Sequence, residues 1–396
     1  MKQRSSLTAR YSAVQGSFWM GFCVTISFAA VYLQGLGYSN ASLGVILAVG
    51  NLLGALLGPE VSARIDRSER LSAWGFVWPW LLVEAAILIV LISAPVKGAV
   101  TSVAFALYVA FSVSLNSINL KLFVDCVHGG QGVDYGVARG MGSAAFVLAS
   151  LTLGVLVKRL GVHILPWAGL VMVALQALAH LLLRRGYAPA AVRGGKTEER
   201  GRTMLSFLRE NPRFTVLLVG AALIFFGHNT CTNFLINVTR HAGGDESTLG
   251  ALNGFMAAVE IPVMFFFGRI RGGRRSVSLL RLSLLFFALK ALALPLASSV
   301  PLLFGAFLLQ APSFALYTAV IVDYVAETVP FADSAKAQSL AYSMTTVGAV
   351  LASLIAGRMY DLLTVPQTLW IGAAVTAAGV LLAMLGIISL KVTSLS

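Results

Sequence analysis

The sequence predicts an all-α membrane protein, with about twelve transmembrane helices in two six-helix bundles. Two observations carry this prediction: the composition and an internal repeat. Hydrophobic residues make up 58% of the 396 residues, charged residues only 11%, and the mean hydropathy is +0.84. Soluble domains carry roughly 25% charged residues. A soluble fold this apolar would leave large apolar patches in water, whereas a bilayer solvates them.

Apolar segments long enough to cross a bilayer, which takes about 20 residues, follow one another with short connections. We expect spans at 14–36, 41–61, 72–94, 98–124, 135–157, 162–183, 213–237, 246–268, 276–297, 299–326, 336–358 and 366–390. The first is too long for a signal-peptide core and reads as a spanning helix. We therefore predict an N-terminal bundle at 1–184, a basic cytoplasmic linker at 185–212 and a C-terminal bundle at 213–396.

The charges predict the orientation of the chain in the membrane. Most Lys and Arg residues fall on one side, in the N-terminal tail, the linker and the loop 269–275. The opposite side carries only Lys97, Lys158, Arg159, Arg240 and Arg358. By the positive-inside rule both termini are cytoplasmic, and we expect a bacterial inner-membrane protein. The net charge of +13 does not indicate nucleic-acid binding, because no basic platform interleaved with aromatic residues is present.

An internal repeat relates the two halves. The pentapeptide 147–151 (VLASL) recurs at 350–354, an offset of 203 residues, and Gly154 and Trp167 recur in the same register as Gly357 and Trp370. In addition, Arg64-Ile65 recurs as Arg269-Ile270 after the second span of the other half. Duplicated halves around a central cavity are typical of secondary transporters that work by alternating access.

The loop from Ser62 to Arg70 resembles the G-x-x-x-D-R-x-x-R signature of the major facilitator superfamily, with Ser62 in place of the first glycine. Its counterpart from Gly268 to Arg275 keeps the glycines but has Arg271 where Asp is usual. The resemblance implies the fold of that superfamily, with a gate at this loop. The gating candidates are Asp66, Arg67, Arg70, Arg269 and Asp323; an ordinary basic loop is the alternative.

Two further segments resemble the MFS_1-like branch that holds lactose permease and the nucleoside–proton symporters. The segment 135–143 is similar to that branch's opening of the fifth helix, and 257–266 is similar to its eighth helix around a coupling glutamate, here Glu260. Other positions depart from the permease pattern. Gln310 and Ser313 replace its His and Glu, Asn229 and Thr232 its aspartates, Thr345 its Lys and Lys121 its sugar-contacting Glu. The departures argue against lactose as substrate and against the same proton relay.

Ionisable residues within spans are the main functional candidates, because an unpaired charge at mid-bilayer costs on the order of 3 kcal/mol or more. Glu260 is the first candidate for proton coupling or substrate binding, with a satisfied structural carboxylate as the alternative. Pro262 is expected to break the helix nearby. Arg139 is expected to bind a substrate or to pair with Glu260, Asp125 or Asp134. Lys290, placed midway along the ninth helix, is expected to pair with Glu260, to bind an anion or to snorkel.

Polar and aromatic residues within spans complete the candidate site, since they bind hydroxyls and amides or stack on rings. They are Trp19, Asn116, Asn119, His228, Asn229, Asn233, Asn237, Gln310 and Tyr317. For each one alone, hydrogen bonding between helices is the better explanation.

The sequence contains no phosphate-binding loop, catalytic triad or metal cluster, so we expect neither an enzyme nor a cofactor. We predict proton-coupled symport of a small polar solute, such as a sugar or nucleoside, by a monomer. Absence of the superfamily's G-P-x-x-G antiporter signature from the fifth span favours symport. Proton-driven efflux of drugs or metabolites is the alternative, and a membrane receptor or scaffold without transport is a third possibility.

Overall fold

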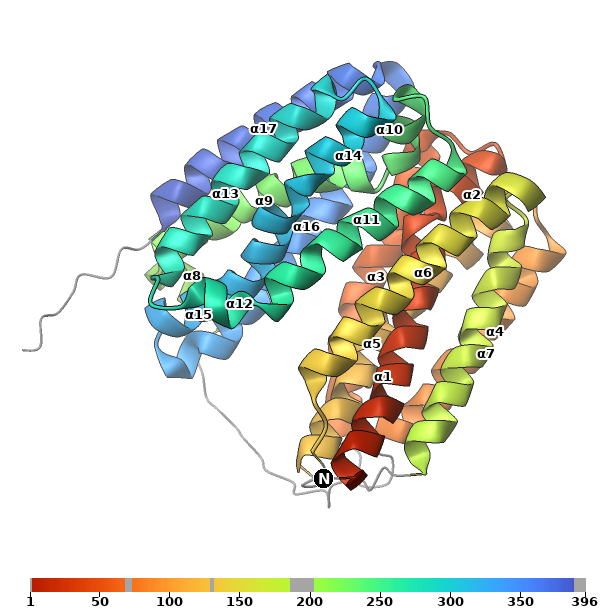
Figure 1. Cartoon of the computed structure of the whole chain (residues 1–396), viewed down its shortest axis with the longest axis horizontal. Coiled ribbons are helices and arrows are strands. Elements are labelled where there is room, and N and C mark those ends of the chain that lie inside the picture. Colours follow the sequence, from red (N-terminus) through yellow and green to blue (C-terminus); the bar gives the residue numbers. More distant parts are fainter. Residues whose placement is uncertain (1, 68–72, 129–131, 186–202, 388–396) are drawn as a thin grey trace, which may run out of the picture.

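The chain folds into two bundles of helices that meet at one end and diverge toward the other (Figure 1). The computed structural model describes residues 2–67, 73–128, 132–185 and 203–387, and every regular element in these ranges is helical. Eleven of their helices are long and apolar enough to cross a membrane, and a bent pair brings the number to 12. The predicted all-α membrane fold is therefore confirmed.

The first bundle comprises α1 (Lys2–Phe22), η1 (Cys23–Ser27), α2 (Ala29–Gly35), α3 (Asn40–Arg67), α4 (Ala73–Ser93), α5 (Ala99–His128), α6 (Tyr135–Leu160) and α7 (Ile164–Arg184). A short helix, α8 (Met204–Glu210), lies in the segment expected to be a linker. The second bundle comprises α9 (Pro212–Thr232), α10 (Leu235–His241), α11 (Glu246–Phe265), α12 (Phe267–Arg271), α13 (Ser276–Ala293), η2 (Leu294–Leu296), α14 (Val300–Leu308), η3 (Ala311–Ala315), α15 (Leu316–Thr328), α16 (Phe331–Leu362) and α17 (Val365–Gly386).

Local sequence explains where several helices begin. The carboxylate of Asp134 accepts the backbone N–H of Val137 and caps α6. Thr364 and Gln367 form a capping box at the start of α17. Such caps satisfy backbone N–H groups that have no partner within the helix. Because they stand at the ends of apolar segments, the observed helices follow the predicted spans closely.

Two spans contain a π-helical turn. The first bends by 43° after the π-helical turn η1, and the tenth contains the π-helical turn η3 with Pro312 inside it. Both turns lie in helices that reach the interior, where freed carbonyls find other partners. The expected break at Pro262 is displaced, because α11 continues through that residue to Phe265.

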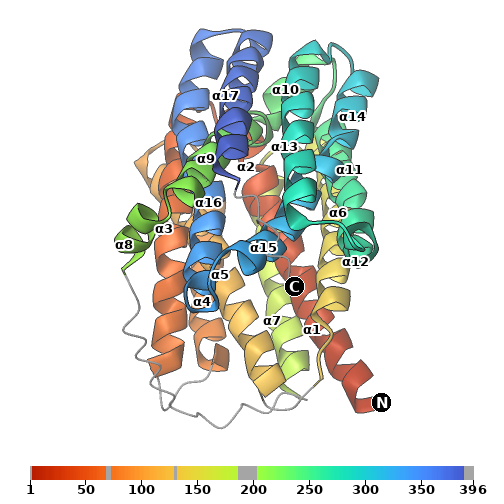
Figure 2. The ribbon, with the colours of Figure 1, turned by 90° about the vertical axis from the view of Figure 1, so that its left-hand side faces the viewer.

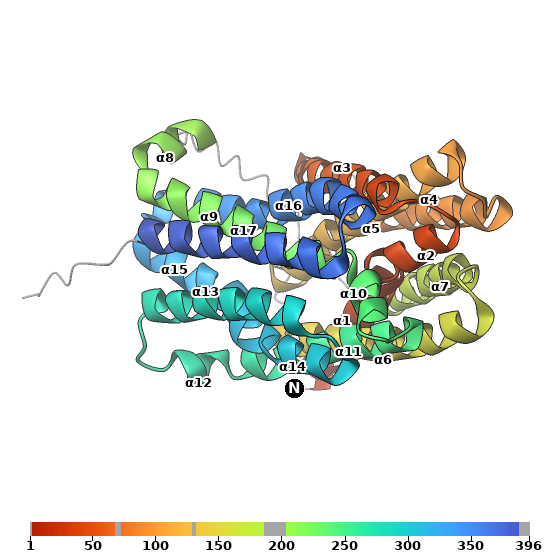
Figure 3. The same cartoon turned by 90° about the horizontal axis from the view of Figure 1, so that it is seen from above.

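The two bundles touch mainly through two helix pairs, α3 with α16 and α6 with α11. The pairs lie on opposite sides of the molecule (Figures 2 and 3). A Cβ atom on Gly44 would lie 1.9 Å from the carbonyl oxygen of Ser353, and one on Gly250 would lie 2.4 Å from that of Ser150. Ser150 and Ser353 are equivalent positions of the repeat. The repeated pentapeptide therefore marks two equivalent backbone-to-backbone contacts.

Polar contacts also join the bundles at the end of the molecule where the bundles meet, which we call the closed end. Gln34 donates to the amide oxygen of Asn237 at 2.8 Å. The carboxylate of Asp361 accepts the backbone N–H groups at the start of α3. Its equivalent in the repeat, Lys158, forms an ion pair of 2.7 Å with Asp245 at the start of α11. Each half thus binds the beginning of a helix in the other half.

Substituting Gly44 tests the close approach at the closed end. Gly44→Ala is expected to cost about 1–3 kcal/mol, because the added methyl overlaps a backbone carbonyl of α16. The control Gly305→Ala, in a helix with open space around the glycine, is expected to be neutral or stabilising by about 1 kcal/mol. Thermal unfolding of the purified chain compares the two. Equal melting temperatures for both variants would show that the contact does not hold the bundles.

The ion pair between Lys158 and Asp245 predicts a pH effect. The hydrogen-bonded Lys158, helped by the backbone N–H of Thr248, lowers the pKa of Asp245 to about 2, against about 3.9 in an unfolded chain. The pair's stabilisation is therefore present above about pH 4 and disappears as the pH falls through about 2. Lys158→Gln should melt below wild type at neutral pH, with the gap closing in acid. Arg159→Gln, on the adjacent exposed residue, should show no such gap.

Candidate functional site

A chain of hydrogen bonds connects the buried ammonium of Lys290 to the half-buried carboxylate of Glu260 inside the second bundle. The Lys290 ammonium donates to Gln310 Oε1 at 2.7 Å, and Gln310 Nε2 donates to Glu260 Oε1, also at 2.7 Å. Lys290 and Gln310 are 2% and 3% exposed. The amide of Gln310 accepts from the cation and donates to the carboxylate, so it bridges the pair without a mismatch. Three helical segments, α13, α11 and the turn at η3, bring these residues together.

His228 extends this chain on the other side of Lys290. Its Nδ1 lies 3.0 Å from the Lys290 ammonium. An ammonium is a hydrogen-bond donor only, so Nδ1 is the acceptor. The neutral His228 ring therefore carries its proton on Nε2. The ring stacks on Phe314 with centroids 5.2 Å apart. Lys290 itself lies in the last turn of α13 rather than midway along it. Its burial among these partners rules out snorkelling in this conformation.

A second cluster faces the chain from the first bundle. The Arg139 guanidinium lies 4.0 Å from the ring centroid of Trp19 and donates to Ser143 Oγ at 2.8 Å. Arg139 also interacts electrostatically with Glu260 across the interface between α6 and α11. Gly142 leaves room for the Trp19 ring, since a Cβ there would lie 2.6 Å from it. The guanidinium is thus oriented by a ring face and a hydroxyl, beside the carboxylate of the other bundle.

Trp19 is held in turn by buried polar side chains of the first bundle. Its Nε1 donates to Gln15, and Gln15 donates to the Tyr11 hydroxyl. That hydroxyl donates to the backbone carbonyl of Asn119, which is 0% exposed. Asn119, predicted to line the cavity, therefore lies inside the first bundle. It supports the site through Tyr11 rather than facing the space between the bundles.

The side chain of Asn119 contacts His180, which fixes the direction of its amide. His180 Nδ1 lies 2.7 Å from the carbonyl of Gln176 and must donate to it. Nε2 of a neutral ring is then an acceptor, and it lies 3.0 Å from the atom assigned as Asn119 Oδ1. Turning the amide by half a rotation places Nδ2 there as the donor. This orientation also explains why Nδ2 otherwise has no partner.

The remaining predicted residues fall into two groups. Asn229 donates to the carbonyl of Phe225 in its own helix, and Asn233 donates to Ser353 Oγ at 2.9 Å. Asn233 thus joins α9 to α16. The gating candidates that the structure describes lie in helices α3, α12 and α15: Asp66 pairs with Lys121, Asp323 accepts from Arg271 at 3.0 Å, and Arg269 lies over Phe266. Arg67 is exposed, and Arg70 lies outside the described residues. These pairs join helices within one bundle.

Two residues of the two clusters, Gln15 and Ser143, were not among the residues predicted from the sequence to line the site, whereas His228 was. Both are neutral and common in spans. Only their spacing could have indicated them. Ser143 lies four residues from Arg139 and Gln15 lies four residues from Trp19, in each case on the same helix face. Among the described residues no group of His, Cys, Asp and Glu is arranged to hold a metal ion.

Comparison with known proteins identifies the fold. A sequence profile of the MFS_1 like family matches residues 17–371. No curated protein sequence matches the chain significantly.

Solved structures resemble the chain over nearly its whole length. A mutant of the nucleoside transporter NupG has a TM-score of 0.78 at 16% identity, covering 98% of this chain and 100% of that one. Another NupG structure has a TM-score of 0.75 at 16% identity, covering 97% and 98%. An auto inhibited POT family peptide transporter has a TM-score of 0.71 at 13% identity, covering 97% and 96%. At these identities the likeness shows the fold alone.

A double-mutant cycle tests the bridged charges. Lys290→Met and Glu260→Gln are each expected to destabilise the protein, because each leaves the other charge buried without its counterpart. Breaking a buried pair from one side costs about 3–5 kcal/mol. The double variant should lose less than the sum, with a coupling of about 0.5–3 kcal/mol measured by thermal unfolding. Additive losses would show that Gln310 does not couple the two. Lys97→Met, on an exposed residue, is the control.

Proposed function

The chain belongs to the MFS_1 like family, and we propose that it is a proton-coupled symporter of a small polar solute, such as a sugar or a nucleoside. The observation that carries the proposal is the bridged pair of Lys290 and Glu260 facing Arg139 between two bundles that are joined at one end. Buried ionisable groups at such a position are typical of proton-coupled transport.

The geometry supports alternating access. Tyr135 of α6 and Tyr342 of α16 interact across the two bundles, yet they are 38% and 54% exposed. Water therefore reaches the space between the bundles away from the closed end. With the orientation expected from the basic loops, this open end faces the cytoplasm of a bacterial inner membrane. The conformation is then the inward-facing one, in which solute is released.

Three groups have complementary roles in the proposed cycle. Glu260 takes the coupling proton. The protonated carboxyl is neutral, so it attracts the Gln310 amide and the Lys290 ammonium less strongly. Arg139 binds an acceptor atom of the solute, and the ring of Trp19 keeps the guanidinium in place. Once the proton has left, the Glu260 carboxylate is charged again and its pairing with Lys290 through Gln310 is restored. Proton movement and solute movement are thereby linked through the charge on Glu260.

The choice of solute follows from the polar character of these groups. Guanidinium, amide and ammonium donors around one carboxylate suit hydroxyl and carbonyl groups of a sugar or nucleoside. The nucleoside transporter among the similar structures makes a nucleoside the first solute to try. A functional monomer requires nothing beyond the two bundles, and we propose that unit.

Uptake into proteoliposomes tests the proposal. A labelled nucleoside or sugar that raises the melting temperature is offered under an inward proton gradient. One pH unit supplies about 1.4 kcal/mol per proton, which is about tenfold accumulation for a symport of one proton. Accumulation should vanish with a protonophore and in Glu260→Gln. That variant should still exchange labelled for unlabelled solute, because exchange needs no net proton movement.

Glu60→Gln, which changes an exposed carboxylate on α3, is the matched control and should accumulate like wild type. Accumulation that survives in Glu260→Gln would refute coupling through this residue. Extrusion of the solute against its gradient would instead establish the efflux alternative, and absence of flux for every ligand bound would favour a receptor.

A further inference from the structure

A carboxyl group that lies outside the candidate site is buried in the middle of the first bundle. Glu84, the only charged side chain of α4, is 1% exposed and lies about midway along the helix. Its Oε1 has no hydrogen-bond partner. Glu84 lies apart from the candidate site, because α4 packs mainly against α5 and α7, whereas Arg139 stands on α6 and Lys290 on α13.

Few other ionisable groups face Glu84. From α5, Tyr108 interacts electrostatically with it. On α7, Gly169 is the residue that approaches Tyr108: a Cβ added there would lie 3.0 Å from the Tyr108 hydroxyl. His163 and His180 lie about 9 Å and 17 Å along α7 from that point, at 1.5 Å per residue. The first is exposed and the second is bonded to Asn119 and Gln176.

An unpaired carboxylate in such surroundings is strongly disfavoured. Removing an isolated charge from water costs far more than protonating it, so a buried carboxyl without a cation is occupied by a proton. Glu84 differs in this respect from Glu260, which has a bridged ammonium and a guanidinium nearby. The burial of Glu84 therefore indicates the neutral acid in this conformation.

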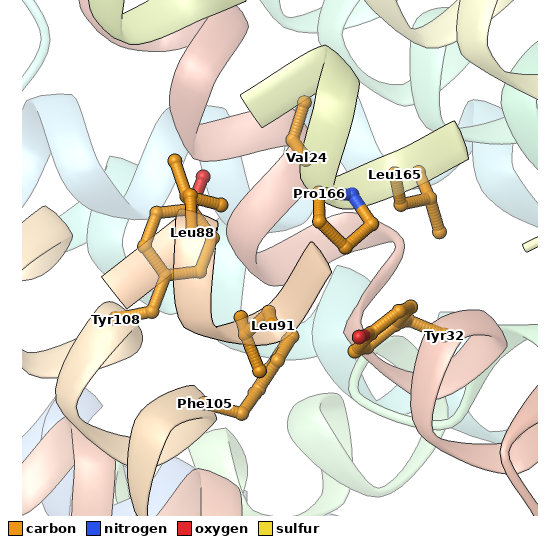
Figure 4. Close-up of a pocket in the computed structure, with 8 residues that line it drawn as sticks. All are labelled: Val24, Tyr32, Leu88, Leu91, Phe105, Tyr108, Leu165 and Pro166. Carbon is orange, nitrogen blue, oxygen red and sulfur yellow. The ribbon is translucent and has the colours of Figure 1, made fainter. Parts of the chain in front are cut away.

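A small cavity lies beside the bend of the first span, and its lining reaches α4 at Leu88, one helical turn from Glu84. It has a volume of about 10 Å³, about the size that one water molecule requires. Val24 and Tyr32 line it from the two sides of the bend, and Leu88 and Tyr108 line it from α4 and α5 (Figure 4). The hydroxyl of Tyr32 is buried without a partner.

We propose that Glu84 is a proton-binding site of the first bundle, which holds its proton in this conformation and exchanges it with water that enters beside the bend of the first span. The π-helical turn η1 leaves this segment able to straighten, and straightening enlarges the cavity beside Tyr108. The site is separate from Glu260, so it stands whether or not Glu260 carries the coupling proton.

Infrared spectroscopy of the purified full-length chain tests the site directly. Wild type at neutral pH should show a protonated-carboxyl C=O band that is lost in Glu84→Gln and kept in Glu260→Gln. The band should shift in heavy water and fade as the pH is raised into the alkaline range. A spectrum unchanged by Glu84→Gln would show an ionised group. A band that persists at every pH and never shifts would show a fixed acid. Either result overturns the proposal.

A second pair of variants tests the exchange path. Val24→Phe fills the cavity and should slow the heavy-water shift at least about tenfold, since exchange then needs transient opening of a packed core. Val45→Phe adds the same bulk at a position that is 50% exposed and should leave the rate unchanged. Equal rates in both variants would exclude this path.

If Glu84→Gln does not fold, carbodiimide labelling of the wild-type chain tests whether Glu84 is protonated. An apolar carbodiimide adds to protonated carboxyls in apolar surroundings, and mass spectrometry of the wild-type chain locates the adduct. Label at Glu84 that decreases as the pH rises supports the site. Label at Glu260 with none at Glu84 overturns it.

Discussion

The structure depends on the close approach of two helix pairs at the closed end. Gly44 and Gly250 let the backbones of α3 and α11 touch the carbonyls of Ser353 and Ser150. Between helices in lipid there is no hydrophobic drive, so close backbone packing and polar contacts must hold the bundles together. Ser150 and Ser353 are equivalent in the repeat, so the two halves contribute the same kind of contact at the closed end.

The charges of the candidate site are connected through an amide side chain. Gln310 connects Lys290 to Glu260 while remaining neutral itself. A directly buried ion pair would be hard to separate, since separation leaves two bare charges. An amide bridge keeps both charges satisfied at a greater distance. Protonation of Glu260 then needs no large rearrangement, and Arg139 on the other bundle is able to respond to it.

The first bundle has its own polar interior. The contacts from Trp19 through Gln15 and Tyr11 to Asn119 run between α1 and α5, away from the second bundle. Satisfied buried networks specify one packing arrangement and stiffen it. These contacts hold the ring of Trp19 in place beside the Arg139 guanidinium. Glu84 differs from the members of this network, because its Oε1 has no hydrogen-bond partner among the described residues.

Much of the candidate site was visible in the sequence as separate residues. Glu260, Lys290, Gln310, Arg139 and Trp19 were each identified because polar groups are costly in a span. Their roles are still proposals, but their connection into two facing clusters is a matter of which helix faces meet. Asn119 shows the limit: its position in a span was correct, yet its face of α5 turns into the first bundle. Glu84 was overlooked although it is the only charge in its span.

The sequence by itself determined the membrane class, the positions of the spans and the repeat. These follow from apolar length and from local capping, which neighbouring residues decide. Only the tertiary structure decided that Gln310 bridges two charges, that Asp66 and Asp323 pair within their own bundles and that Glu84 has no cation. A helix in lipid is stable in any rotation about its axis until another helix packs against it. The partners of its polar residues are therefore set by helix packing, which acts between segments far apart in the chain.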